Sequence, residues 1–281
     1  MNVVSLFNGM NTGRQALENV GIKVNKYYSS EIKPYAIELT QHHFPDTIQV
    51  GDVTKWKEWN IDWSSIDLIL SGSPCQDLSA AGKRAGINGS KSSLFFVFVE
   101  ILEHIKTLNP KVLFLQENVG SASKLDVGIM SRALGVYPVR INSKLLTAQL
   151  RDRYYWSNIR TKETMFDLVT DIPQPKDTGI LLKDIILSGF VDKDKHTCLN
   201  TESGNDSHSQ NYWINRNNKT GMITLIYENE LVRTVNQIEM ERLQGFPDGY
   251  TSILSKAKSG SLLGDGWTIP IIEHIFKFIE R

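Results

Sequence analysis

The 281 residues suffice for one large α/β domain with a modest insert, and 41% hydrophobic and 22% charged residues describe an ordinary soluble globule. Zero net charge argues against a protein that coats nucleic acid without sequence preference, although it allows a local basic groove. No stretch is apolar enough to span a bilayer, no signal peptide is evident, and only Cys75 and Cys198 occur, which predicts a reducing, cytoplasmic home.

Strand-like and helix-like segments alternate from residue 2 to about 160. We expect strands at 3–7, 24–29, 47–50, 66–70 and 111–115, and helices at 12–20, 34–43 and 94–108. Such alternation predicts a parallel sheet with right-handed crossovers. Residues 161–230 are more polar, carry 7 basic against 11 acidic residues, and predict a small separate domain. Helices expected at 237–243 and 269–279 return the chain to the first domain, which we expect to comprise 1–160 and 231–281.

Glycine and two acids stand at the ends of the first three expected strands. Gly9 lies in the turn Phe7–Gly13, Glu31 follows the second strand, and Asp52 follows the third. Glu31 is placed to accept hydrogen bonds from both hydroxyls of a ribose, and Asp52 could accept from an adenine amino group. Each residue alone is more often a turn, a cap or a solvated charge. Their series favours an adenosine cofactor, and the lack of G-x-G-x-x-G favours S-adenosylmethionine over a pyrophosphate.

Cys75 follows the fourth expected strand in Ser73-Pro74-Cys75-Gln76. Ligands in open α/β sheets bind at the carboxyl ends of strands, so this cysteine is a candidate nucleophile, although a lone cysteine is more often a small buried hydrophobe. Glu117 ends the fifth strand and could hydrogen-bond ring N3 and the amine of a cytosine. Arg151 and Arg153 stand two residues apart, which on a strand places both on one face. A thiolate, a proton-bearing acid and positive charge are what addition to cytosine carbon 6 requires.

These motifs occur in the order found in a known enzyme family. The chain resembles the DNA (cytosine-5) methyltransferases, in particular their short de novo type, over residues 2–160 and 231–281. The resemblance rests on Leu6–Gly13, Ser30-Glu31, Gly51–Val53, Gly72–Ser79, Glu117–Val119, Gln149-x-Arg151-x-Arg153, Glu241–Pro247 and Leu263–Pro270. It implies a Rossmann-like methyltransferase fold with a mixed, mostly parallel seven-stranded sheet and a target recognition domain at 161–230.

The resemblance also implies roles for individual residues. Cys75 would be the nucleophile, Glu117 would engage N3, and Arg151 and Arg153 would orient the base and the catalytic loop. The cofactor residues would be Phe7, Gly9, Met10, Asn11, Thr12, Glu31, Ile32, Asp52, Val53, Ser73, Pro74, Gly266 and Trp267. Arg242 and Gln244–Pro247 would brace the target recognition domain.

The implied partner is double-stranded DNA, from which the target cytosine must be flipped at a cost of about a few kcal/mol. The loop Ala80–Gly86 would close over it, with Lys83 and Arg84 on phosphates, although it could be a plain solvated loop. We expect further DNA contacts from Gln76, Ser79, Gln149 and Arg216. His196 and Cys198 are too few ligands for zinc, so we expect no metal.

Two other functions remain open at this stage. A few relatives of this architecture methylate cytosine in tRNA, and the neutral charge does not decide between the substrates. A DNA-binding module without catalysis is disfavoured by intact Cys75, Glu117, Arg151 and Arg153.

We expect a monomer from a bacterium or a phage-infected host cell, with S-adenosylhomocysteine as the second product.

Overall fold

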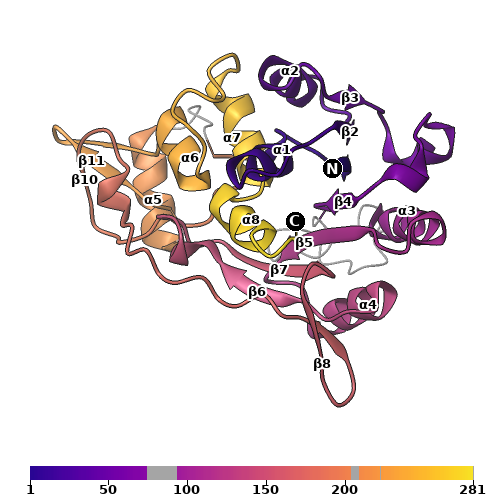
Figure 1. The fold of residues 1–281 in the computed structure, drawn as a ribbon. Helices are drawn as coiled ribbons and strands as arrows, with labels where there is room; N and C mark the ends of the chain where they lie inside the picture. The colour runs from indigo at the N-terminus through magenta and orange to yellow at the C-terminus, as the bar shows by residue number, and fades with distance from the viewer. Residues whose placement is uncertain (75–93, 204–208, 222, 281) are drawn as a thin grey trace. The chain divides into compact units, whose positions relative to one another are not determined.

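The computed structural model of the protein describes residues 1–74, 94–203, 209–221 and 223–280. It divides into two compact units (Figure 1). The first unit comprises residues 1–141, 152–174 and the chain from 273 onward. The second unit comprises residues 142–151 and 175–272.

The first unit is built on a seven-stranded sheet with strand order β3-β2-β1-β4-β5-β7-β6 (Figure 1). Strands β1 to β5 are parallel and β7 runs antiparallel to β5, so the sheet is mixed and mostly parallel, as predicted. Strands such as β4 are buried on both faces, which explains their continuous apolar sequence. The strands are β1 (Asn2–Leu6), β2 (Lys26–Ser30), β3 (Ile48–Gln49), β4 (Leu68–Ser71), β5 (Leu113–Val119), β6 (Val139–Asn142) and β7 (Asp152–Ser157).

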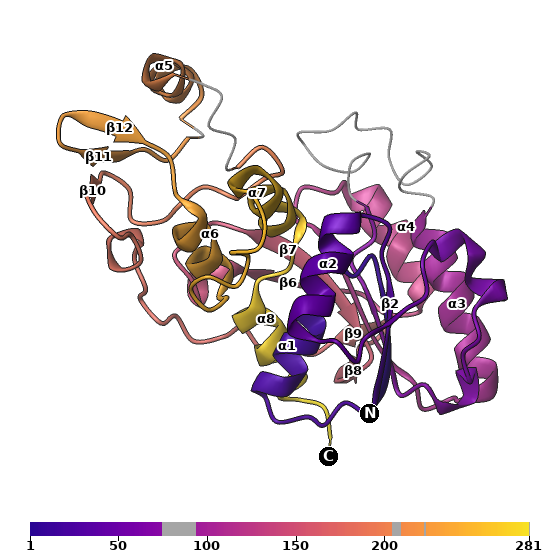
Figure 2. The ribbon, with the colours of Figure 1, turned by 90° about the horizontal axis from the view of Figure 1, so that it is seen from above.

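Helices cover both faces of this sheet, and Figure 2 shows α1 and α2 on one side and α3 and α4 on the other. The chain moves outward from β1 through β2 to β3 and then in the opposite direction from β4 to β5. Right-handed crossovers therefore place the two helix pairs on opposite faces, and the direction changes between β1 and β4. The helices are α1 (Thr12–Asn19), α2 (Pro34–His43), α3 (Leu94–Leu108) and α4 (Lys124–Leu134).

The core of the first unit lies between α3 and the sheet. Five side chains of α3 are fully buried, at helical spacing: Phe95, Phe98, Ile101, Leu102 and Ile105. Burying one such side chain stabilises the fold by about 1.5–3 kcal/mol, and truncating a core phenylalanine costs about 3–5 kcal/mol. This packing holds β4 and β5 side by side, with Ser71 opposite Gln116 at their carboxyl ends.

The described residues of the second unit include a three-stranded antiparallel sheet and the helices α5, α6 and α7. The strands are β10 (Phe190–Val191), β11 (Ile226–Glu228) and β12 (Leu231–Arg233), and the helices are α5 (Gln210–Thr220), α6 (Gln237–Gln244) and α7 (Lys256–Asp265). Helix α6 begins with a capping box between Asn236 and Glu239 and ends at Gly245. Helix α8 (Ile269–Phe276) begins in the second unit and ends in the first, where Asn19 of α1 donates to the Glu273 carboxylate at 2.5 Å.

The two units do not coincide with the predicted domains. The hairpin of β8 (Thr161–Glu163) and β9 (Leu168–Thr170) belongs to the first unit, because the Tyr137 backbone exchanges 2.8 Å hydrogen bonds with Leu168 and Thr170. Residues 142–151 and 231–272, which we assigned to the first domain, lie in the second unit. A target-recognition role for 161–230 therefore stays a prediction.

Strand β5 is longer than predicted and ends at Val119 rather than residue 115. The apolar pattern ends at Leu115, and the sequence therefore predicted the end of the strand there. Strand β7 pairs with the following residues in antiparallel register and supplies hydrogen-bond partners for their backbone N–H and C=O groups. Glu117, which we expected at the end of the strand, therefore lies within β5, opposite Tyr155, and the strand continues for two residues beyond it. The final helix ends at Phe276 and not at 279.

Candidate functional site

The turn after β1 holds three residues in the left-handed region. Phe7 has φ 55°, Gly9 has φ 59° and Asn11 has φ 66°. A bulky residue such as Phe7 pays about 1–2 kcal/mol for this conformation, and strain of this kind is retained mainly at functional sites. Nothing in the described chain lies within 4 Å of where a Cβ on Gly9 would stand, so the backbone is open to a ligand there.

The Glu31 carboxylate organises this turn. Its Oε2 accepts the Gly9 N–H at 2.8 Å, and its Oε1 accepts the N–H groups of Ile32 and Lys33 at 2.8 and 2.9 Å. A carboxylate has roughly four acceptor positions, so one remains for a hydroxyl of the ligand. The Ile32 side chain beside it is 71% exposed and offers an apolar surface at the same strand end.

Asp52 stands at the end of β3 with an exposed carboxylate. Hydrogen bonds from the Thr54 N–H and hydroxyl, both 2.9 Å from Oδ1, lower the pKa of this carboxyl below its ordinary value. The second oxygen has no hydrogen-bond partner among the described residues. Asp52 can therefore accept from an amino group, as the sequence predicted.

The other predicted cofactor residues of the first unit differ in exposure. Buried are Met10, Asn11, Thr12, Val53 and Ser73, whereas Phe7 and Pro74 are half-buried. Both Asn8 Nδ2 and Asn11 Oδ1 are buried without a hydrogen-bond partner among the described residues. Leaving a buried polar atom without a hydrogen bond costs free energy, and a polar ligand bound in this turn could supply the missing partners.

Two residues that sequence reasoning did not place in the site hold Ser73. Gln116 Nε2 donates to the Ser73 hydroxyl at 2.9 Å and Asn118 Nδ2 does so at 3.4 Å. Both amides are buried on β5. Polar side chains in a buried strand need partners, and this was the sequence signal that could have identified them.

Glu117 and Arg153 form an ion pair at the carboxyl end of β5. Arg153 Nε lies 2.8 Å from Glu117 Oε1, and the side chains are only 13% and 11% exposed. The pairing of β5 with β7 sets this contact, because Val119 lies opposite Arg153 and Glu117 opposite Tyr155. The sequence placed both residues in the site, and the structure brings them together.

Arg151 has different partners within the second unit, although it stands two residues from Arg153. Its guanidinium donates to the backbone oxygens of Leu199, Gly264 and Gly266 at 3.2, 3.0 and 2.7 Å, and to Cys198 Sγ at 3.3 Å. The side chain is almost fully buried. The geometry is that of a brace between three segments of the second unit.

Gln149 is fully buried in the second unit. Its Nε2 donates to Leu243 O and Gln244 Oε1 at 3.2 and 3.3 Å, and its Oε1 accepts the Leu199 N–H at 2.9 Å. A direct DNA contact by this side chain would require it to leave these partners, so its burial does not fit the predicted contact. Gln244 Oε1 also accepts a hydrogen bond from the Thr268 hydroxyl at 2.7 Å. Gln244, which was predicted only as a brace of the target recognition domain, therefore connects several buried polar groups.

Three other predicted site residues belong to the second unit. Gly266 accepts the hydrogen bond from Arg151, and Trp267 next to it is half-buried. Arg216 on α5 donates to the Tyr212 hydroxyl at 2.7 Å and lies 3.7 Å from the Glu202 carboxylate. The Arg216 guanidinium is therefore already in contact with the Tyr212 hydroxyl and close to the Glu202 carboxylate.

Several predicted site residues lie outside the described residues, namely Cys75, Gln76, Ser79, Lys83 and Arg84. Across the described ranges, no three or more His, Cys, Asp and Glu side chains gather in a way that could hold a metal ion. No helix in the part of the chain that the structure describes is long and apolar enough to cross a membrane.

The chain matches known methyltransferases in sequence. A family model described as C-5 cytosine-specific DNA methylase matches residues 1–212 and 191–281. The type II methyltransferase M1.ScrFI of Lactococcus lactis subsp. cremoris is 28% identical over 304 residues, which cover 97% of this chain and 76% of that protein. The orphan methyltransferase M.SPRI of Bacillus phage SPR is 34% identical over 172 residues, which cover 57% of this chain and 38% of the phage protein.

Solved structures share the fold at low sequence identity. The methyltransferase EhMeth of Entamoeba histolytica has a TM-score of 0.69 at 15% identity, covering 99% of this chain and 97% of its own. A DNMT2 of Spodoptera frugiperda has a TM-score of 0.64 at 17% identity, covering 99% of both chains.

The fold is that of the Rossmann-like methyltransferases, with acids at the carboxyl ends of the first strands. The chain belongs to the C-5 cytosine-specific DNA methylase family. It is a cytosine C5 methyltransferase, and its methyl donor is S-adenosylmethionine. Both the family and the donor confirm what the sequence predicted.

The groups of the first unit that could hold this methyl donor follow the carboxyl ends of β1, β2 and β3. Glu31 keeps an acceptor position that could serve a ribose hydroxyl, Asp52 keeps an oxygen that could accept from an adenine amine, and the backbone at Gly9 is open. All three groups stand at the carboxyl edge of the sheet, where ligands of doubly wound folds bind.

Proposed function

We propose that the chain methylates carbon 5 of a cytosine flipped out of a specific sequence in duplex DNA, through a covalent bond between Cys75 and carbon 6. The observation that carries the proposal is the ion pair of Glu117 and Arg153, with its oxygen and nitrogen 2.8 Å apart, at the carboxyl end of β5. Strand β4 lies beside β5 in parallel register, and Cys75 follows β4 by four residues.

Cys75 supplies the nucleophile. Carbon 5 of cytosine is a poor nucleophile until the Cys75 thiolate adds to carbon 6, because the addition moves the electrons of the C5–C6 double bond to carbon 5. That carbon then forms its bond to the methyl carbon while the methyl–sulfur bond breaks, and the sulfur keeps the bonding electrons and leaves as the neutral thioether. Removal of the carbon 5 proton by a base re-forms the double bond and expels the thiolate, which restores Cys75 for the next turnover.

Glu117 and Arg153 hold the ring for this step. Glu117 can pass a proton to N3, and its carboxylate then accepts hydrogen bonds from the N3–H and from the exocyclic amine. A protonated N3 draws electrons from carbon 6 and makes it susceptible to the thiolate. Arg153 fixes the orientation of this carboxylate and adds positive charge next to the ring, in a site with little water.

The methyl donor supplies an electrophilic methyl group bound to a positively charged sulfur. We propose that Glu31 orients its ribose and Asp52 its adenine, with Ile32 packing against the base. The buried Met10, Thr12 and Val53 would support the floor of this site. Gly266 and Trp267 belong to the second unit, and their part in cofactor binding stays a prediction from the resemblance.

Other chain segments would hold the DNA. We propose that Gln76, Ser79, Lys83 and Arg84 contact the DNA around the flipped nucleotide. Arg151 would act by bracing the second unit, through its bonds to the carbonyls of Leu199, Gly264 and Gly266. We propose that the enzyme works as a monomer in the cytoplasm of a bacterium or a phage-infected host.

Transfer of labelled methyl groups from S-adenosylmethionine to duplex DNA and to tRNA tests the proposal. We expect incorporation into duplex DNA and background incorporation into tRNA, with no incorporation by Cys75→Ser. Equal incorporation by Cys75→Ser would refute the covalent mechanism. Preferential incorporation into tRNA would refute the proposed substrate.

A further inference from the structure

Helix α5 of the second unit is well defined at both ends yet has no buried residue. The Ser209 hydroxyl caps its start by accepting the Tyr212 N–H, and Gly221 ends it with φ 62°. Lys193 holds the C-terminal end, where its Nζ donates to the oxygens of Gly221 and Ile223 at 3.0 and 2.8 Å. Its side chains are therefore at least partly accessible along the whole helix.

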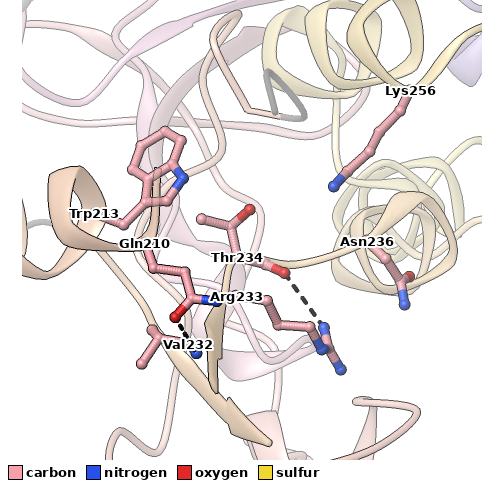
Figure 3. Close-up of a pocket in the computed structure, with 7 residues that line it drawn as sticks. All are labelled: Gln210, Trp213, Val232, Arg233, Thr234, Asn236 and Lys256. Carbon is pink, nitrogen blue, oxygen red and sulfur yellow. Dashed lines mark hydrogen bonds between the residues drawn. The ribbon is translucent and has the colours of Figure 1, made fainter. Parts of the chain in front are cut away.

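One face of α5 packs beside β12. Gln210 and Trp213 point into a hollow of about 190 Å³ whose other walls include Val232, Thr234 and Lys256 (Figure 3). The Val232 N–H donates to Gln210 Oε1 at 3.5 Å. Gln210 and Trp213 are three residues apart and therefore mark the inner face of the helix.

The opposite face carries three asparagines. Asn211, Asn215 and Asn218 follow each other at spacings of four and three residues, which places them on one face, away from Trp213. All three are exposed, and none of their side-chain amides forms a hydrogen bond with another described residue. Each amide therefore presents two donors and an acceptor to whatever approaches this face.

The charge of α5 suits a polyanion. The helix contains Arg216 and Lys219 and no acidic residue, whereas residues 161–230 as a whole carry 11 acidic against 7 basic residues. The acids of this region are thus kept off the helix. Lys219 is exposed next to Asn218, where it can meet a phosphate.

We propose that the asparagine face of α5, formed by Asn211, Asn215 and Asn218, enters the major groove and reads the bases around the target cytosine. The inference rests on the proposed function and specifies its recognition element. The major groove admits an α-helix, and asparagine pairs with adenine through N6 and N7. The recognised sequence therefore contains at least one A·T pair, read by this face.

The face also has a definite footprint. Seven residue steps along the helix span roughly 10 Å, which corresponds to about three base-pair steps of duplex DNA. Asn211 and Asn218 therefore read positions about three base pairs apart, and Asn215 reads between them. Substituting one asparagine should therefore abolish the base preference at one position of the recognised sequence and keep the preferences at the other positions.

The experiment first establishes the sequence that the wild-type full chain methylates in a random duplex library, by sequencing 5-methylcytosine. Asn211→Ala, Asn215→Ala and Asn218→Ala are then compared with Asn217→Ala. Asn217 is the matched control because it lies on the same helix but is half-buried and receives the Lys193 Nζ at 3.4 Å. We expect the outer variants to lose about 10- to 100-fold in transfer to the recognised sequence and to relax one position each. Asn217→Ala should keep the wild-type sequence.

A second measurement uses the wild-type enzyme and so does not depend on any variant folding. Replacing the recognised adenine by 7-deazaadenine removes the N7 acceptor, and we expect a loss of similar size that the matching asparagine variant no longer shows. A recognised sequence without an A·T pair, or unchanged specificity in all three outer variants, would overturn this inference alone. No transfer to any duplex by the wild type would overturn the proposed function together with it.

Discussion

Substitution of Arg151 and Arg153, two residues apart in the chain, should distinguish a bracing residue from a catalytic one. Arg151→Ala removes a guanidinium that donates to three backbone oxygens and one sulfur within the second unit. Arg153→Ala removes the partner of Glu117 at the carboxyl end of β5. The first change should destabilise the fold, and the second should in addition slow the reaction.

The structure sets the size of both effects. A hydrogen bond to a charged group contributes about 1.5–3 kcal/mol, but water can enter the Arg151 site and reach the carbonyls, so we expect Arg151→Ala to cost about 3–5 kcal/mol in total. Arg153→Ala leaves the Glu117 side chain, only 11% exposed, without this ion-pair partner, so we expect a loss of about 3–5 kcal/mol in stability from this change too. Loss of a positive charge beside the reacting ring should slow methyl transfer by about 100- to 1,000-fold.

Urea unfolding followed by circular dichroism measures the stabilities, and labelled methyl transfer to duplex DNA measures the rates. Arg151→Lys serves as a milder variant, because one ammonium can satisfy only part of the four acceptors, and its unfolding midpoint should lie between those of the wild type and Arg151→Ala. An Arg151→Ala chain that unfolds at the wild-type urea concentration would refute the bracing role. An Arg153→Ala enzyme with the wild-type rate would refute the catalytic one.

Three further predictions concern glycine geometry, pH and cofactor binding. Gly245→Ala should cost about 2–5 kcal/mol in urea unfolding, because Gly245 has φ 80° and a Cβ there would collide with the Pro270 ring. Gly249→Ala, with φ 82° but open space, should cost only about 1–2 kcal/mol, and equal losses would contradict the packing argument. Burial lowers the pKa of His196 to about 4. The contribution of neutral His196 to the free energy of unfolding should therefore be complete above pH 6.5 and should decrease by at most about 3 kcal/mol as the pH falls from 6.5 to 4. A His196→Gln variant should lack that part of the acid loss, and an unchanged pH profile would count against the assignment. Asp52→Asn should weaken binding of S-adenosylmethionine by about tenfold in calorimetry without shifting the unfolding midpoint, whereas unchanged affinity would exclude the proposed adenine contact.

Local sequence signals predicted the elements that position the site. Pro34 sets the start of α2, and Asn109-Pro110 follows the end of α3, so both helices begin and end where expected. The acids Glu31 and Asp52 could be placed because carboxyl ends of parallel strands meet at one edge. These inferences needed only neighbours in the chain and the rules of parallel sheets.

Contacts between residues far apart in the chain could not be predicted from local sequence signals. The spacing of Arg151 and Arg153 predicted a shared face, but β7 begins at Asp152, and Arg151 bonds instead to Gly264 and Gly266, 113 and 115 residues away in the chain. Gln149 similarly pairs with Gln244, 95 residues away. A polar pattern on a short segment indicates that partners exist, but not which ones.

The covalent bond between Cys75 and the target base is the central claim, and trapping it is the most direct test. Duplex DNA in which 5-fluorocytosine replaces cytosine cannot release the thiolate, because carbon 5 then carries fluorine instead of the proton that must leave. Incubation of the full chain with this DNA and S-adenosylmethionine should give a denaturation-resistant complex, and peptide mapping should place the DNA on Cys75. Cys75→Ser should give none. A complex mapped to Cys198, or no complex from an enzyme that methylates ordinary duplex DNA, would contradict the mechanism.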